Sequence, residues 1–179
     1  MKNIEYFFDC SSPWTYLSFR GILELRDKKE FEIIWKPILV GGIFNSINPS
    51  VYESRKNPVE EKLKYSQKDL KDWAKLRNLE INWPKIFPIN SVKAMRGAFH
   101  FIERNTLEDY LESVFSGYWT HGKDISNIDT LLQIVNKIGE DQEQYLEVVN
   151  SEEAKQKLIE NTQELMERGG FGSPTFFVN

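Results

Sequence analysis

The residue types near the N-terminus that could do chemistry lie in the run Cys10-Ser11-Ser12-Pro13-Trp14-Thr15. Ser12 comes where a short apolar segment gives way to an amphipathic one, and Pro13 fits the first position of a helix. A hydroxyl at that point faces free backbone N–H groups and the positive end of the helix dipole, so it could bind or orient a negatively charged atom. A plain helix cap needs the same residue, and Ser12 alone does not establish a site.

A second serine–proline pair, Ser173-Pro174, lies near the other end of the chain. It follows the glycine-rich stretch 169–172 and heads an apolar run typical of a strand. A proline at such a place can carry a cis peptide bond, which marks a tight and functionally placed turn. Pro174 also fits an ordinary loop.

Cys10 is the only cysteine, so an internal disulfide is excluded. The residue three positions on is Pro13, and the chain therefore has no Cys-x-x-Cys pair for disulfide exchange. We expect Cys10 to face the core at the end of a strand. His100 and His121 lack metal-ligand spacing, and we predict no metal site.

Composition narrows the class of partner. The 179 residues are 40% hydrophobic and 28% charged, with a net charge of −4 and no cluster of lysine and arginine. We expect neither a nucleic-acid nor a membrane partner. No apolar run approaches transmembrane length, and the first residues do not resemble a signal peptide. These features favour a cytoplasmic protein that acts on a small molecule.

Apolar periodicity predicts the elements that must position the serines. Strands are expected at 4–8, 31–40 and 174–178, the second ending at Gly41-Gly42. One helix begins at Pro13, and another is opened by a capping box, Asn57-Pro58-Val59-Glu60. Further helices are expected at 92–104, 107–119, 129–138, 142–150 and 152–168. The order indicates an α/β protein whose three strands share a sheet. Its discontinuous domain covers 1–42 and 151–179, with a helical insertion over 43–150.

A set of short motifs appears in a characteristic order along the chain. The motifs are Phe8-Asp9-x-x-Ser12-Pro13-x-x-Tyr16-Leu17, Trp35-Lys36-Pro37, Gly41-Gly42-Ile43-Phe44, Asn48-Pro49, Lys62-x-x-Tyr65-x-x-x-Asp69-Leu70, Phe87-Pro88-Ile89-Asn90-Ser91, Ala94-Met95-Arg96, Trp119-x-x-Gly122-x-Asp124-Ile125 and Phe171-Gly172-x-Pro174-Thr175-Phe176. The ordered set resembles the thioredoxin-fold superfamily. Within it, the chain is most similar to the branch of kappa-class glutathione transferases and 2-hydroxychromene-2-carboxylate isomerases, which are relatives of the DsbA-like oxidoreductases.

The resemblance implies a thioredoxin-like fold with a large all-helical insertion, and glutathione as the cofactor. Ser12 matches the family serine that hydrogen-bonds the glutathione sulfur. Ser173, before the expected cis-Pro174, matches the residue whose backbone pairs with the cysteinyl unit. Asn48 and Lys62 match residues that help to hold the tripeptide, although both also fit an ordinary solvated surface. A hydroxyl donor at a helix N-terminus favours a thiolate, which agrees with the role implied for Ser12.

The isomerase activity implied by the resemblance interconverts a hydroxychromene carboxylate and a benzylidenepyruvate through thiolate addition to a conjugated double bond. Such a reaction needs a cation for the substrate carboxylate, and Lys36 and Arg96 are the candidates. Arg96 also fits a surface salt bridge. Asn90, Tyr65 and Trp119 are candidates for lining the substrate pocket.

Two other functions stay open: a general kappa-like glutathione transferase or peroxidase, and a non-catalytic thioredoxin-fold binding module. The family tends to form homodimers. It also continues after the third strand with a hairpin strand and a last helix, whose connecting turn supplies a Ser/Gln-Asp pair for the glutamyl end of glutathione. This sequence ends at Asn179, so we expect that strand, helix and pair to be missing from it.

Overall fold

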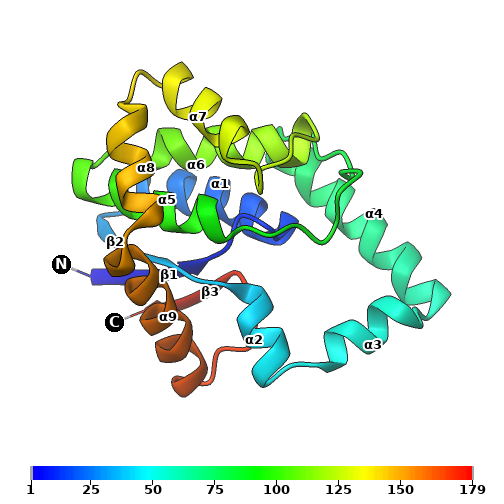
Figure 1. Ribbon diagram of the computed structural model, residues 1–179. Helices are drawn as coiled ribbons and strands as arrows, with labels where there is room; N and C mark the ends of the chain where they lie inside the picture. The colour runs from blue at the N-terminus through cyan, green and yellow to red at the C-terminus, as the bar shows by residue number, and fades with distance from the viewer. Residues whose placement is uncertain (1, 179) are drawn as a thin grey trace.

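A three-stranded mixed sheet lies between two groups of helices in the computed structural model, which describes residues 2–178 (Figure 1). In chain order the elements are β1 (Lys2–Phe8), α1 (Pro13–Arg26), β2 (Phe31–Pro37), α2 (Val40–Ser46), α3 (Ser50–Lys56), α4 (Glu60–Leu76), α5 (Val92–Arg104), α6 (Leu107–Phe115), the π-helix η1 (Ser116–Thr120), α7 (Ile128–Lys137), α8 (Gln142–Asn150), α9 (Glu152–Glu167) and β3 (Thr175–Val178).

The sheet has the order β2-β1-β3, with β1 parallel to β2 and antiparallel to β3. Tyr6 on the central strand is in register with Trp35 on one side and Phe176 on the other. The rings of Tyr6 and Phe176 stack at 4.6 Å between centroids. The prediction that two strands from the start and one from the end share a sheet is confirmed.

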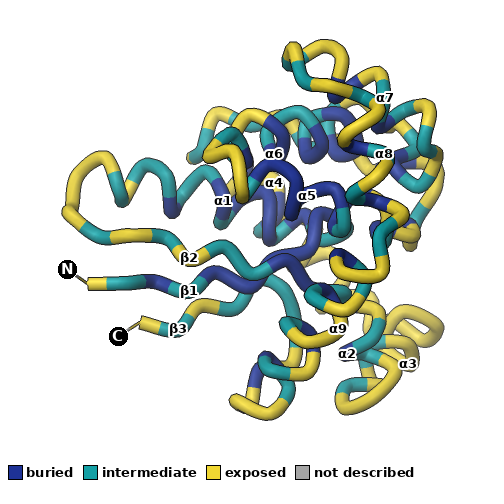
Figure 2. The backbone as a smooth tube through the Cα atoms, turned by 60° about the vertical axis from the view of Figure 1, so that its left-hand side comes forward, coloured by how far each residue is buried: buried dark blue, intermediate teal, exposed yellow. Residues whose placement is uncertain are grey.

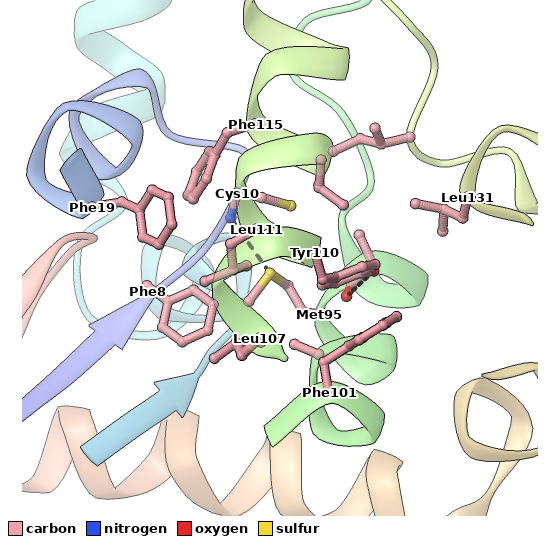
Figure 3. Close-up of a cluster of buried hydrophobic side chains, with 14 of the residues drawn as sticks. Phe8, Cys10, Phe19, Met95, Phe101, Leu107, Tyr110, Leu111, Phe115 and Leu131 are labelled. Carbon is pink, nitrogen blue, oxygen red and sulfur yellow. Dashed lines mark hydrogen bonds between the residues drawn. The ribbon is translucent and has the colours of Figure 1, made fainter. Parts of the chain in front are cut away.

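Alternation along β1 divides the core between the two faces of the sheet. Tyr6 and Phe8 point into a large cluster that includes residues of α1, α5 and α6, whereas Phe7 packs with residues of α2 and α9. Figure 2 shows β1 as the most deeply buried strand. Figure 3 shows Phe8 and Cys10 in the large cluster, where the Cys10 N–H donates to Met95 Sδ at 3.4 Å. The prediction that Cys10 faces the core is confirmed.

Helices α3 and α4 form an arm at the side of the molecule (Figure 1). Leu70 and Ala74 of α4 pack on Leu17 of α1, but α3 buries none of its residues. Leu63 and Trp73 of the same helix are both more than 40% exposed. The arm is therefore held to the body at one end of α4 and leaves a cleft beside α1.

Two predicted boundaries were wrong. The second strand stops at Pro37, because the Val40 N–H is bound by the Asp9 carboxylate at 2.9 Å and α2 begins there, with Gly41-Gly42 inside it. Asn57 does not cap α4: it ends α3, a helix that the sequence analysis missed, and α4 starts after Val59 without a side-chain cap.

The other helices follow the predicted ranges closely. Helices α5 and α8 have the predicted ends, and the predicted helix at 107–119 corresponds to α6 followed by η1, which ends at Thr120. Within residues 2–178, no helix combines the length and the apolar character needed to cross a bilayer.

The contact between α5 and α8 provides a test of the packing. A Cβ atom at Gly97 would lie 2.3 Å from Cε2 and 2.4 Å from Oη of Tyr145, whose hydroxyl is held by Tyr110 at 3.0 Å. We expect Gly97→Ala to lower the free energy of unfolding by about 1–3 kcal/mol, because the buried ring has no room to move. Urea unfolding measures this change.

The matched control is Gly41→Ala, since a Cβ atom there meets nothing within 4 Å. It should leave the free energy of unfolding unchanged or raise it slightly, because alanine favours a helix more than glycine does. Equal effects of the two substitutions would contradict the packing described for α5 and α8.

Candidate active site

The two serine–proline turns meet at the C-terminal end of β1. The Ser12 hydroxyl donates to the Ser173 carbonyl oxygen at 3.0 Å, across 161 positions of the sequence. The Ser173–Pro174 peptide bond is cis, as predicted. The Ser173 hydroxyl accepts from the Asp9 N–H at 2.9 Å and lies 2.8 Å from Thr15 Oγ1. One residue of the turn therefore contacts both the end of β1 and the first turn of α1.

Ser12 is the N-cap of α1, as its position before Pro13 predicts. Its backbone is extended, and its Oγ accepts from the Thr15 N–H at 3.4 Å. The first turn of α1 contains no acidic residue, so no side chain of the helix neutralises the positive end of its dipole. A half-buried hydroxyl at this end can donate to an anion that enters beside it.

Asp9 is buried directly behind the serines and connects β1 to α2. Its carboxylate oxygens accept from the N–H groups of Ser11 and Val40, both at 2.9 Å. Burial raises the pKa of this carboxyl above its ordinary value, and hydrogen bonds from Ser11, Val40 and Ser91 partly oppose the rise. Asp9 therefore fixes the start of α2 relative to the serine turn.

A cleft of about 990 Å³ opens in front of Ser12 and Ser173. Its floor is the start of α1 and the turn at Ser173, and its sides come from α2, the α3–α4 arm and the segment 83–92. The size lies at the upper end of small-molecule sites, which fits a bulky ligand or two ligands side by side.

Aromatic rings and one guanidinium shape the cleft. Trp83 and Phe87 contact each other at 4.7 Å between centroids, and Phe44 faces Tyr52. The Arg55 guanidinium carbon lies 5.5 Å from the Phe44 ring centroid and 5.1 Å from that of Phe87. The cleft thus offers flat apolar walls together with cationic groups, since Lys62 also lines it.

Four of the residues singled out from the sequence line this cleft: Ser12, Lys62, Asn90 and Ser173. Asn90 also accepts from the Val92 N–H at 3.0 Å, which orders the start of α5. Asn48 lies just outside, where its amide donates to the Phe171 carbonyl at 3.1 Å. It therefore holds the segment that leads into Ser173.

The structure does not bring the other four candidates to the cleft, which corrects their expected placement. Lys36 shares the sheet face of Phe7 and pairs with Glu164 of α9 at 2.9 Å. Arg96 donates to the Val149 carbonyl, and Tyr65 is 69% exposed on α4 and outside the lining. Trp119 is fully buried and donates to the Cys10 carbonyl at 2.9 Å, so it supports Trp83 and Phe87 from behind.

Sequence reasoning missed several residues that shape the site, among them Asp9, Trp14, Arg55, Trp83 and Phe87. Asp9 and Phe87 are part of the family motifs given above, and Trp14 lies in the run that contains Ser12, but none of the three was predicted as a site residue. Arg55 gave no signal, because nothing in a mixed-charge segment marks one cation as facing a cleft. In the part of the chain that the structure describes, no group of three or more histidine, cysteine and acidic residues could hold a metal ion.

The fold and the cis-proline turn define a thioredoxin-like protein. Residues 3–179 match the DSBA-like thioredoxin domain, and the chain belongs to that family. It is 27% identical to a 2-hydroxychromene-2-carboxylate isomerase of Pseudomonas sp. strain C18, over 98% of this chain and 81% of the relative. It is 26% identical to glutathione S-transferase kappa 2 of Caenorhabditis elegans, over 99% of this chain and 81% of that protein.

Solved structures share the fold. A 2-hydroxychromene-2-carboxylate isomerase superposes with a TM-score of 0.80 at 23% identity, covering 99% of this chain and 85% of the other. A cytosolic disulfide reductase of Pseudomonas aeruginosa, solved with GSH, superposes with a TM-score of 0.68 at 13% identity, covering 97% and 84%. At these identities the likeness describes the fold.

The buried Asp9 carboxyl predicts a pH dependence of stability. Its pKa is higher in the folded protein than its ordinary value of 3.8. Its contribution to stability is therefore fully present below that value and is lost as the pH rises through the folded-state pKa. We expect the free energy of unfolding of the wild type, minus that of Asp9→Asn, to fall as the pH rises from about 4 through the folded-state pKa.

Chemical denaturation at a series of pH values gives this difference. Asparagine keeps one oxygen for the N–H groups, so a constant offset between the proteins is expected and only the slope tests the assignment. A difference that stays flat, or rises with pH, would contradict the raised pKa.

Proposed function

We propose that this protein is a glutathione-dependent enzyme of the 2-hydroxychromene-2-carboxylate isomerase type. One observation carries the proposal: a hydroxyl, that of Ser12, stands at the helix N-terminus opposite the cis-proline turn, where it faces the cleft. The sulfur must then come from a bound thiol. The sole cysteine, Cys10, is fully buried, and burial raises the pKa of its thiol well above the ordinary value.

Ser12 acts as a hydrogen-bond donor to the glutathione thiolate. A hydroxyl has one proton, and the Ser12 proton is now directed to the Ser173 carbonyl. An amide N–H of glutathione would compete for that carbonyl, and the Ser12 hydroxyl would then turn its proton toward the sulfur. The positive end of α1 adds to the preference for the charged form, which lowers the thiol pKa.

The isomerisation is reversible addition and elimination. Bound glutathione would supply a thiolate that adds reversibly to the β-carbon of the conjugated double bond, and its elimination would restore that bond in the other geometry without an external reductant or oxidant.

The surroundings supply the remaining roles. Lys62 faces the cleft as a cation for a glutathione carboxylate, and Asn48 holds the segment before Ser173. Pro174 keeps the Ser173 carbonyl turned to Ser12, and Asn90 lines the substrate side of the cleft. The aromatic side chains provide flat surfaces for an aromatic-derived substrate.

A kappa-type glutathione transferase or peroxidase is the second candidate, favoured by the similarity to glutathione S-transferase kappa 2. It needs the same thiolate but a different electrophile. Turnover of a chromene carboxylate against a halogenated nitrobenzene separates the two reactions. Calorimetry that detects no glutathione binding would instead favour a non-catalytic binding module. We further propose a cytoplasmic setting in aromatic-compound catabolism, with a homodimer as the assembly to test.

The role of Ser12 leads to a direct prediction. We expect Ser12→Ala to lower kcat/KM for the chromene carboxylate roughly 100-fold, because the thiolate loses the hydroxyl donor at the N-terminus of α1. Glutathione should still bind, since the Ser173 backbone and Lys62 remain.

The control is Ser46→Ala, which removes an exposed hydroxyl from the end of α2 outside the cleft. Its kcat/KM should match that of the wild type. If Ser12→Ala retains full turnover, Ser12 is only a helix cap and the proposed mechanism fails.

A further inference from the structure

The charge of the cleft is opposite to that of the chain. The protein carries a net charge of −4, yet two of the three Asp, Glu, Lys or Arg residues that line the cleft, Arg55 and Lys62, are cations. The third is Asp9, which is buried at the base with both carboxylate oxygens occupied by backbone N–H groups. A ligand in the outer cleft therefore meets positive charge with no exposed carboxylate beside it, which favours an anion.

The Arg55 guanidinium is held by rings and has no ion pair or hydrogen bond to another residue between 2 and 178. Its carbon lies over Phe44 of α2 at 5.5 Å and over Phe87 of the opposite wall at 5.1 Å, so it spans the cleft. Attraction to ring faces positions a guanidinium without using its N–H donors. Arg55 thus presents an oriented set of donors that the protein itself does not satisfy.

The other cations considered from the sequence cannot take this role. Lys36 is paired with Glu164 on the far face of the sheet, and Arg96 donates to the Val149 carbonyl. Lys62 is an ammonium group on α4, a point charge that lacks a planar fork. Arg55 combines position in the cleft with the geometry that binds a carboxylate through two parallel hydrogen bonds.

We propose that Arg55 is the specificity-determining residue of the cleft, and that it binds the carboxylate of a planar aromatic or conjugated acid whose ring lies against Phe44 or Phe87. That this acid is the electrophile of the isomerisation rests on the proposed function. Binding of the acid itself depends only on the cleft. Neutral electrophiles gain nothing from Arg55, so the residue separates carboxylate substrates from the neutral aromatic substrates of a general transferase.

The test uses trans-cinnamate and trans-cinnamamide, which share a ring and a conjugated double bond but differ in charge. Trp14 and Trp83 line the cleft, so quenching of tryptophan fluorescence reports binding without glutathione. We expect wild-type protein to bind cinnamate at least about tenfold more tightly than cinnamamide at neutral pH. Arg55→Met should remove this preference and leave cinnamamide binding within about twofold, because methionine keeps the aliphatic contact with the rings.

Two further variants separate charge from geometry and from general effects. Arg55→Lys keeps the charge but loses the fork, and should retain only part of the preference. Lys56→Met removes the neighbouring cation at the exposed end of α3, outside the cleft, and should leave the preference intact. Unchanged cinnamamide binding also shows that each variant is folded.

The proposal is overturned if wild-type protein does not distinguish the acid from the amide, or if Arg55→Met weakens both ligands equally. Calorimetry with glutathione tests the proposed function separately from the role of Arg55. Cinnamate selectivity without glutathione binding would retain Arg55 and remove the glutathione mechanism. Glutathione binding without cinnamate selectivity would retain the glutathione mechanism and remove the role proposed for Arg55.

Discussion

The contact between Ser12 and Ser173 is the interaction on which the rest of the site depends. Through its carbonyl and its hydroxyl, Ser173 joins the end of β1, the start of α1 and the turn before β3. The Asp9 N–H lies at the buried base of this junction, and an unpaired N–H there would cost about 1–3 kcal/mol. The same contact that completes the sheet therefore places a hydroxyl at the positive end of a helix.

The chemistry of the junction depends on the atom at the end of the side chain at position 12, which is an oxygen and not a sulfur. A sulfur at position 12 would make the protein its own nucleophile, whereas the oxygen of Ser12 is, in the proposed mechanism, a donor for a sulfur that arrives with a ligand. Cys10 cannot substitute, because it is buried on the other side of the junction with its N–H directed to Met95. In the proposed mechanism the thiol is borrowed, so its reactivity depends on how well the cleft holds the ligand, and the surrounding walls become part of that mechanism.

The walls also show why the cleft accepts an anion. Helices α3 and α4 stand away from the sheet, and α3 buries no residue of its own. Their contribution is the set of side chains that they direct across the cleft, Arg55 and Lys62 among them. The Arg55 guanidinium connects this arm to the opposite wall through Phe87. The same side chain therefore lines the cleft and joins the arm to its opposite wall.

The elements that could be predicted from the sequence are those whose signals are local. Helix α8 begins at Gln142 because the Asp141 side chain accepts from two of its first N–H groups, and that pattern is visible in the sequence. The second strand was predicted to run to residue 40, but β2 ends at Pro37, because the Val40 N–H donates to the Asp9 carboxylate, 31 positions away in the sequence. Helix α3 was missed because it has no buried face and hence no apolar periodicity.

The same distinction applies to the site. The motif that contains Ser12 and the turn that contains Ser173 are recognisable by themselves, and the cis bond at Pro174 was expected. Which cation faces the cleft is set by how distant elements pack, and no spacing reports it. Lys36 and Arg96 were the predicted carboxylate partners and Arg55 was not, yet the positive charges of Lys36 and Arg96 lie against Glu164 and the Val149 carbonyl.

Titration of the bound glutathione thiol tests the central claim most directly. The ultraviolet absorbance of the thiolate, followed against pH in wild-type protein and in Ser12→Ala, gives the thiol pKa in each. The account predicts a pKa well below the ordinary value of roughly 8.5 in the wild type. Loss of the donor should raise it by about one unit in Ser12→Ala. The same thiol pKa in both proteins would contradict the account.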